Sequence, residues 1–321
     1  MNYRGTYNGV NGYRKKKSKG KIRRFFLKSI FFIICIFSIF FIVFTFINKN
    51  GKNISLSHEV VLSYINVADE LSKEGYQLNW QEIAAINGAV NEGEFNINNK
   101  DQLNSIGKAF FKKNSSNDSI GLRNFDSAIK ELKLDEKEEK LAEDYLIELK
   151  KNYLHSELDK EKIQFIEKVS DGAYKNYKNY GILPSITIGQ AILESGWGES
   201  ELSSRHNNIF GIKADASWSE EKVNMKTKEN YKDVIVGDFR AYNNISSSIE
   251  DHGKFLWENE RYAKNGLFEA KNYRAQAQVL EDAGYSTAKD ENGNLIYGDK
   301  LIRVIQENNL MIYDTKVQRG E

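Results

Sequence analysis

The chain has 321 residues, 40% of them hydrophobic and 28% charged, which is enough for about two domains that each bury a core. Its net charge of +1 hides an asymmetry: ten of the 46 basic side chains precede residue 29, whereas all 45 acidic side chains follow residue 47, so the body of the chain carries −9. A body of this sign is a poor partner for nucleic acid. The single cysteine, Cys35, excludes an intrachain disulfide and a cysteine-based metal site, and the four histidines show no metal-ligand spacing.

The N-terminal region combines a basic stretch with an apolar one. Residues 1–24 hold nine Lys or Arg and no acid, and residues 29–47 are uncharged. The uncharged run would be about 28 Å long as a helix, close to the roughly 30 Å of a bilayer's hydrocarbon core. We expect a cytoplasmic tail (1–24), a transmembrane helix (25–47) and an extracytoplasmic body, because basic flanks stay in the cytoplasm. A cleaved signal peptide is the alternative, but no small-x-small cleavage site follows the run.

Residues 48–157 are expected to form an all-α, extracytoplasmic domain. Apolar side chains recur every three or four residues in four segments, 58–71, 80–90, 103–112 and 135–153. Glu92 and Glu94 follow the second of these, and we interpret them as a solvated helix end because no substrate-binding turn accompanies them. The sequence therefore predicts a spacer or interaction domain that offers a surface to protein partners.

A second helical pattern begins near residue 158 and leads to the chemistry. Pro184, the only proline, suits the first turn of a helix that ends at Ser195-Gly-Trp-Gly. Glu194 stands at the end of that helix, one turn after Gln190. The negative end of the helix dipole, together with desolvation under nearby aromatic rings, would raise its pKa and keep it protonated for transfer to a glycosidic oxygen. Taken alone, a glutamate at a helix end is more often a cap or an ion-pair partner.

Several motifs in order resemble one family. The segment 183–213 contains Gln-Ala-Ile-Leu-Glu-Ser-Gly-Trp-Gly and Asn-Asn-Ile-Phe-Gly-Ile-Lys, followed by Phe239-Arg-Ala-Tyr-Asn, Ser248-Ile-Glu-Asp-His252 and Gly284-Tyr-Ser-Thr. These resemble the glucosaminidase family of bacterial cell-wall hydrolases, glycoside hydrolase family 73. The resemblance implies an α+β, lysozyme-like domain over residues 158–315, mostly helical with a small β-hairpin lobe. It also implies cleavage of the β-1,4 bond after N-acetylglucosamine in peptidoglycan, with Glu194 as general acid.

Hydrolysis of this kind needs a second group on the other face of the sugar. Alternation of apolar and polar residues between residues 222 and 242 predicts a β-hairpin. Glu229 falls on the same face as Val223 and Met225, where an apolar side chain is expected, and it matches the family's second catalytic glutamate. We predict that it acts as base or electrostatic partner. A strand-end glutamate in solvent is the alternative.

Further candidates come from the matched motifs. Tyr285 corresponds to a tyrosine that the family keeps near the scissile bond, although Ala288 and Lys289 replace the family's usual Asp-Pro pair and leave the loop conformation open. The predicted substrate-binding residues are Gln190, Trp197, Asn208, Phe210, Trp218 and Tyr242. For Phe210 and Tyr242 a role in the core is an equal alternative, because large aromatic side chains are mostly buried.

The sequence thus predicts a membrane-anchored peptidoglycan hydrolase whose partners are glycan strands, with no nucleic acid. No cofactor or metal is expected, because two carboxylates supply the acid and the base. One alternative is a non-catalytic glycan-binding scaffold at the membrane. The other is a muramidase or lytic transglycosylase, which would cut the other glycosidic bond.

Overall fold

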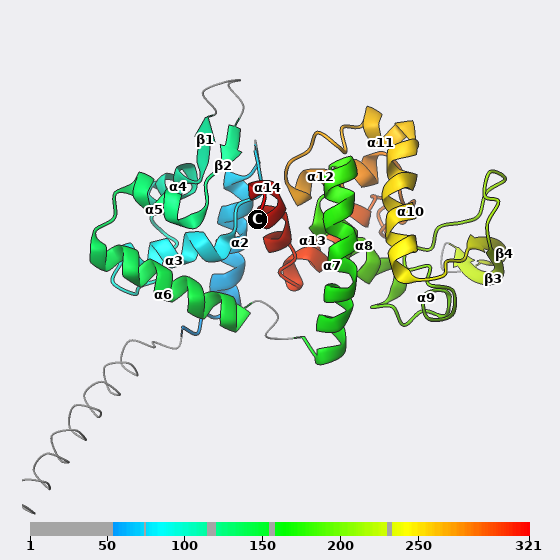
Figure 1. Cartoon of the computed structure of the whole chain (residues 1–321), viewed down its shortest axis with the longest axis horizontal. Coiled ribbons are helices and arrows are strands. Elements are labelled where there is room, and N and C mark those ends of the chain that lie inside the picture. Colours follow the sequence, from blue (N-terminus) through cyan, green and yellow to red (C-terminus); the bar gives the residue numbers. More distant parts are fainter. Residues whose placement is uncertain (1–53, 74, 114–119, 154–157, 230–232) are drawn as a thin grey trace, which may run out of the picture. The chain divides into compact units, whose positions relative to one another are not determined.

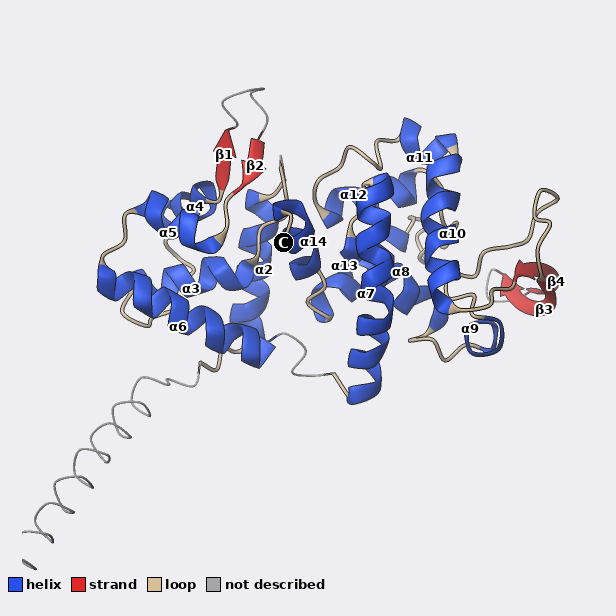
Figure 2. Ribbon diagram, viewed as in Figure 1, coloured by secondary structure: helices blue, strands red, loops and turns tan. Residues whose placement is uncertain are grey.

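The computed structural model describes residues 54–321 apart from residues 74, 114–119, 154–157 and 230–232, and it leaves out the side chains of residues 227–229 and 233–235. The predicted tail and transmembrane helix at residues 1–47 lie outside the described residues. Among those that are described, no helix is both long enough and apolar enough to span a membrane. Residues 54–321 cluster as one compact unit (Figures 1 and 2).

The first segment of this unit is built on a buried central helix. It comprises α2 (His58–Leu71), α3 (Trp80–Val90), α4 (Lys100–Ala109), β1 (Phe111–Lys113), β2 (Ile120–Leu122), α5 (Phe125–Leu132) and α6 (Glu136–Tyr153). All residues of α3 but the last are buried, and α6 packs along it. Most of the buried residues of α3 are apolar, and its buried polar side chains are hydrogen-bonded: Gln81 Nε2 donates to the Leu149 carbonyl and Asn87 Nδ2 donates to Gln102 Oε1.

The expectation of an all-α segment at residues 48–157 was wrong in one place. The helix predicted at residues 103–112 ends at Ala109, and an antiparallel hairpin, β1–β2, follows. The Arg123 backbone N–H donates to the Phe110 carbonyl at 2.7 Å, and Nη1 of Arg123 donates to the Ala109 carbonyl at 3.0 Å. These two carbonyls at the end of α4 are therefore bonded to Arg123. Strands of three residues are too short to show a period-two pattern in the sequence.

The second segment is mostly helical with one longer hairpin, which confirms this part of the prediction. It comprises α7 (Lys160–Tyr180), α8 (Pro184–Ser195), α9 (Glu201–His206), β3 (Lys222–Glu229), β4 (Asp233–Arg240), α10 (Ile245–Glu258), α11 (Glu260–Lys264), α12 (Tyr273–Asp282), α13 (Tyr297–Glu307) and α14 (Met311–Arg319). The β3–β4 pair is antiparallel, with Lys222 opposite Arg240 at one end and Glu229 opposite Asp233 at the other.

Helix α8 lies at the centre of the second segment. Helices α7, α12, α13 and α14 all contact it, and ten of its twelve residues are buried. It begins at Pro184, as predicted, and ends where Gly196 adopts a left-handed φ of 57°, a conformation that glycine enters without a side-chain clash. Gly189 allows the close approach of α13, because a Cβ there would lie 2.9 Å from Leu301 Cδ1.

Hydrogen bonds join the two segments directly. Trp80 Nε1 donates to Asn309 Oδ1 at 2.7 Å, and Tyr273 donates its hydroxyl to Asp69 Oδ2 at 2.5 Å. Figure 1 shows α14, in red, between the helices of the first segment and those of the second. The described residues of the predicted spacer are therefore packed into the same unit as the C-terminal segment.

Candidate active site

Glu194 is held at the end of α8 by a relay of hydrogen bonds. The Tyr297 hydroxyl donates to Glu194 Oε1 at 2.8 Å. That hydroxyl in turn accepts from Gln190 Nε2, also at 2.8 Å. Gln190 and Tyr297 are buried, and Tyr297 is the first residue of α13. The relay therefore fixes the carboxyl group between two packed helices.

The Glu194 carboxyl is in contact with water and yet closely surrounded by protein. As a residue it is exposed to solvent, but the protein atoms around its carboxyl group reduce the hydration of that group enough to raise its pKa, while the hydrogen bond from Tyr297 opposes that rise. Loss of hydration penalises the charged form of a carboxyl group. An accessible carboxyl group with a raised pKa has the properties that a general acid needs near neutral pH.

Tyr285 lies beside this relay. Its ring centroid is 5.0 Å from that of Tyr297, with an angle of 32° between the rings. Burial raises the pKa of Tyr285 well above its usual value, and the negative charge of Glu194 raises it further. Its hydroxyl therefore stays neutral near the carboxyl group and can donate a hydrogen bond. The structure thus brings together three of the predicted site residues, Gln190, Glu194 and Tyr285.

Tyr297 was not among the predicted site residues. Its hydroxyl meets Glu194 across 103 positions of the chain. The sequence offers only an indirect sign of it: Gln190 stands on an otherwise apolar helix, and a buried amide needs a polar partner. Which of the 17 tyrosines supplies that partner depends on the packing of α13 against α8, and this packing cannot be read from the residues alone.

The turn after α8 places the Trp197 ring against α7. Gly196, Trp197 and Gly198 have φ values of 57°, 63° and 83°, so a non-glycine residue sits in the left-handed region. The Ser195 hydroxyl accepts from the Gly198 N–H at 2.7 Å and so stabilises the turn. The indole packs edge-on against Phe165 at a centroid distance of 6.1 Å. Direct contact of Trp197 with substrate stays a prediction.

Asn208 and Phe210 are buried. Asn208 Nδ2 donates to the carbonyls of Ile212 and Arg240, at 3.0 and 2.8 Å, and its Oδ1 accepts from the Ile212 N–H. Phe210 stacks on His252 with ring centroids 3.9 Å apart. These contacts fasten the loop after α9 to the end of β4 and to α10, and a sugar contact by either residue stays a prediction.

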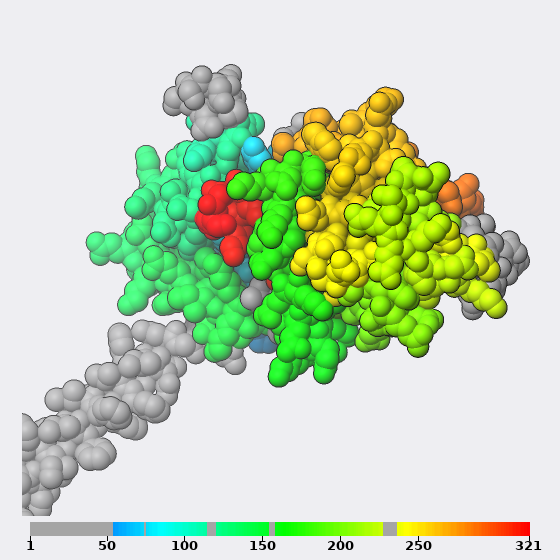
Figure 3. Space-filling view, turned by 45° about the vertical axis from the view of Figure 1, so that its right-hand side comes forward, coloured from blue at the N-terminus to red at the C-terminus, as the bar shows by residue number. Residues whose placement is uncertain are grey.

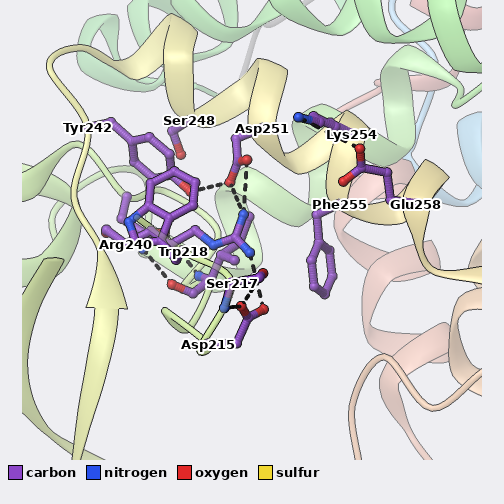
Figure 4. Close-up of polar contacts among 12 residues, drawn as sticks. Asp215, Ser217, Trp218, Arg240, Tyr242, Ser248, Asp251, Lys254, Phe255 and Glu258 are labelled. Carbon is purple, nitrogen blue, oxygen red and sulfur yellow. Dashed lines mark hydrogen bonds and ion pairs between the residues drawn. The ribbon is translucent and has the colours of Figure 1, made fainter. Parts of the chain in front are cut away.

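Trp218 and Tyr242 gather around Arg240, where β4 ends (Figure 4). The Arg240 guanidinium lies 4.3 Å from the centroid of the Trp218 ring and donates to both oxygens of Asp251 at 2.9 and 3.0 Å. The Tyr242 hydroxyl also donates to Asp251 Oδ2, at 2.6 Å. We call these four residues, together with Asp215, the Arg240 cluster. The cluster joins the end of β4 to α10. Whether the Trp218 and Tyr242 rings bind sugar stays a prediction.

Glu229 lies at the opposite end of the hairpin from the Arg240 cluster. The register pairs it with Asp233, next to the turn. Along β3, Val223 and Met225 are half-buried and Asn224 and Lys226 are exposed, as the predicted alternation requires. The side chain of Glu229 is outside the described part of the structure, so its predicted role as base or electrostatic partner stays a prediction. Among the described residues, no group of three His, Cys, Asp or Glu side chains is placed to hold a metal ion.

Comparison with known proteins places the site within a matched segment. Residues 170–310 match the family model for glucosaminidase, described as mannosyl-glycoprotein endo-beta-N-acetylglucosaminidase. The catalytic domain of the autolysin Auto from Listeria monocytogenes is 33% identical, with 49% of this chain and 90% of that chain covered and a TM-score of 0.41.

Curated relatives match the same part of the chain. The exo-glucosaminidase LytG of Bacillus subtilis is 36% identical over 166 residues, which is 49% of this chain and 55% of the relative. The peptidoglycan hydrolase FlgJ of Vibrio parahaemolyticus is 33% identical (44% of this chain, 46% of the relative), and a probable N-acetylmuramidase of Lactococcus lactis is 32% identical (49% and 36%). The chain thus spans about half the length or less of these curated relatives. Residues 170–310 belong to the glucosaminidase family.

Proposed function

We propose that the protein is a peptidoglycan hydrolase that cleaves the β-1,4 bond after N-acetylglucosamine in glycan strands. The observation that carries the proposal is the state of Glu194: an accessible carboxyl group whose pKa is raised by its surroundings and which the Tyr297 hydroxyl holds in one place. It lies inside the segment that matches the glucosaminidase family.

Glu194 would act as general acid. Its carboxyl group gives its proton to the glycosidic oxygen, so that the leaving sugar departs as a neutral alcohol while positive charge develops on the ring of the other sugar. The hydrogen bond from Tyr297 then stabilises the carboxylate that remains. Tyr285, whose hydroxyl stays neutral, would donate a hydrogen bond near the breaking bond.

The second group at the bond is proposed to be Glu229. At the tip of the hairpin it would either activate a water molecule or stabilise the charge on the sugar ring, and attack by the substrate's own N-acetyl group is a further route. The separation of the two carboxyl groups would indicate the stereochemistry: about 5–5.5 Å accompanies retention of configuration, and roughly 6.5–9.5 Å accompanies inversion, in which the second carboxylate activates a water molecule.

The relatives support two specificities. The exo-glucosaminidase favours cleavage after N-acetylglucosamine, and the peptidoglycan hydrolase supports the substrate without indicating the bond. The probable N-acetylmuramidase favours the other glycosidic bond, which makes a muramidase the second candidate. We further propose a single-pass anchor at residues 25–47, with the N-terminus in the cytoplasm, the catalytic segment facing the wall and protein partners on the helical segment.

The rival from another class is a non-catalytic glycan-binding protein that uses the same surface. A protein that only binds gains nothing from an accessible carboxyl group with a raised pKa beside a neutral tyrosine. A zymogram on cell-wall substrate separates the two functions: a cleared band supports hydrolysis, and retention of the protein without clearing supports binding.

The direct test replaces the proposed acid. Glu194→Gln keeps the shape of the side chain but cannot donate a carboxyl proton, so we expect it to abolish the release of reducing ends from purified walls. Glu199→Gln is the matched control, because Glu199 is an exposed glutamate of the turn that follows the same helix. Near-normal activity of Glu194→Gln would overturn the proposal, as would equal losses in both variants.

A further inference from the structure

Helix α8 begins without a cap from its own sequence. The preceding residue, Leu183, has no side chain that can accept a hydrogen bond, and Pro184 has no N–H. The N–H groups of Ile186 and Thr187 donate to the Leu183 carbonyl. The N–H of Ser185 therefore remains as the donor that needs an acceptor from elsewhere in the fold, since an unpaired buried N–H is costly.

Asp314, on α14, supplies that acceptor from 129 positions away. Its Oδ1 accepts from the Ser185 N–H at 2.8 Å, and its Oδ2 accepts from the Ser185 hydroxyl at 2.6 Å. Both residues are fully buried. A carboxylate at this end of a helix also interacts favourably with the helix dipole. Tyr174 and Tyr177 of α7 are the titratable side chains that interact electrostatically with Asp314.

The neighbours of Asp314 on α14 bind the first segment. Thr315 Oγ1 donates to the Gln77 carbonyl at 3.1 Å, and Gln318 Oε1 accepts from the Gln77 N–H at 3.0 Å. Arg319 forms two hydrogen bonds with Glu82, at 2.6 and 2.7 Å, and both side chains are about 5% exposed. Figure 3 shows the red C-terminal residues at the surface between the first segment and α7.

Helix α14 lies beyond the segment that matches the glucosaminidase family, residues 170–310. Helix α14 is hydrogen-bonded both to the start of α8 and to Gln77 of the first segment. We propose that Asp314 is a positioning residue. It fixes the first turn of α8, and because α8 is a packed helix it thereby fixes the position of Glu194 at the last turn of α8. The inference rests on the proposed function of Glu194 as the general acid.

The geometry makes this positioning effective. Ser185 and Glu194 are nine residues apart, about 14 Å along the helix axis, and α7, α12, α13 and α14 pack against α8. A displacement at its first turn is therefore passed to its last turn, where the Tyr297 hydroxyl meets Glu194. Misplacement of a catalytic group by about 1 Å lowers the rate as much as 100-fold.

Three variants of the full chain test the proposal. Asp314→Ala leaves the Ser185 N–H without an acceptor, and we expect kcat to fall about ten-fold or more with KM nearly unchanged. Asp314→Asn retains an acceptor for the N–H and a donor for the hydroxyl, so activity should stay within about two-fold of the wild type. Thr315→Val is the control, because it removes a hydrogen bond from the next residue of α14 without touching α8, and it should lower only the stability.

A second readout follows Glu194 itself. We expect the titration of its carboxyl group, followed by ¹³C NMR and assigned by the signal that disappears in Glu194→Gln, to move in Asp314→Ala and to stay in place in Thr315→Val. An unchanged titration and kcat in folded Asp314→Ala would overturn the proposal. If Asp314→Ala does not fold, Ser185→Ala replaces it: that variant loses the hydroxyl contact with Asp314 and keeps the N–H contact, so we expect a smaller fall in kcat and a smaller move of the titration, and no change in either would overturn the proposal.

The two proposals fail separately. A wild-type protein that releases no reducing ends would contradict the proposed function. The NMR titration would still show whether Asp314 fixes the surroundings of Glu194, because it requires no hydrolysis.

Discussion

Removal of the Tyr297 hydroxyl tests how the proposed acid is controlled. In Tyr297→Phe, Glu194 Oε1 loses the donor now 2.8 Å away, and buried Gln190 loses the acceptor of its Nε2. The Tyr297 hydrogen bond lowers the pKa of Glu194 and opposes the effect of burial. Its loss should therefore raise the pKa and keep the acid protonated to higher pH.

The size of the shift follows from the strength of the bond. A hydrogen bond to an ionised group contributes about 1.5–3 kcal/mol, and because Glu194 is exposed to solvent we discount this to about 1 kcal/mol. Loss of this stabilisation from the charged form raises the pKa of Glu194. The unpartnered amide of Gln190 should also lower the free energy of unfolding by about 1–3 kcal/mol.

The assay is the pH dependence of kcat/KM for the release of reducing ends from purified walls, whose alkaline limb reports the pKa of the acid in the free enzyme. Tyr64→Phe is the control, since it loses a hydrogen bond of 2.6 Å to Asn87 in the first segment. We expect the alkaline limb to move to higher pH in Tyr297→Phe alone. An unmoved limb, or one that moves to lower pH in the folded variant, would refute this account of Glu194.

Three further predictions concern stability. Asp251→Ala should lower the free energy of unfolding in urea by about 3 kcal/mol, because it leaves the nearly buried guanidinium of Arg240 without its closest carboxylate. A change below about 1 kcal/mol would contradict the stabilising role of the Arg240 cluster. Burial lowers the pKa of His252 to about 3. Below about pH 6.5 the unfolded chain therefore binds a proton that the folded chain does not, and the free energy of unfolding falls toward pH 3. His252→Leu should lose less stability between pH 7 and pH 5 than the wild type, and an equal loss would count against a buried neutral imidazole. Burial raises the pKa of Asp314 to about 7, although both hydrogen bonds from Ser185 oppose the rise. Between about pH 4 and 7 the folded chain therefore binds a proton that the unfolded chain does not, and the contribution of Asp314 to the free energy of unfolding declines as the pH rises. Asp314→Asn should reduce this decline, measured as urea midpoints against pH, and an unaltered pH dependence would contradict the raised pKa.

Much of the fold could be predicted because its signals are local. The bounds predicted for α2 and α3 agree with the structure, and α8 begins at Pro184 and ends at Gly196 because proline and glycine act through their own backbone geometry. The β1–β2 hairpin could not be predicted, because its strands are three residues long.

The residues of the candidate site also fall into those that could be predicted from the sequence and those that could not. Glu194 and Gln190 were predicted because both belong to one continuous motif, Gln-Ala-Ile-Leu-Glu-Ser-Gly-Trp-Gly, which resembles that of the family. Tyr297 and Asp314 were not, since each reaches α8 from a distant part of the chain through tertiary packing. Asn208 and Phe210 were predicted from their motif, but their contacts with the Ile212 carbonyl and the His252 ring depend on tertiary packing and could not be predicted from it.

Mass spectrometry of the products from purified peptidoglycan tests the central claim most directly. Wild-type protein and Glu194→Gln would be incubated with the same walls, and the released fragments reduced with borohydride before analysis. The account predicts fragments with N-acetylglucosamine at the new reducing end from the wild type and none from Glu194→Gln. Fragments that end in N-acetylmuramic acid or in an anhydro sugar would contradict the proposed specificity, and equal release by Glu194→Gln would contradict the role of Glu194 as the acid.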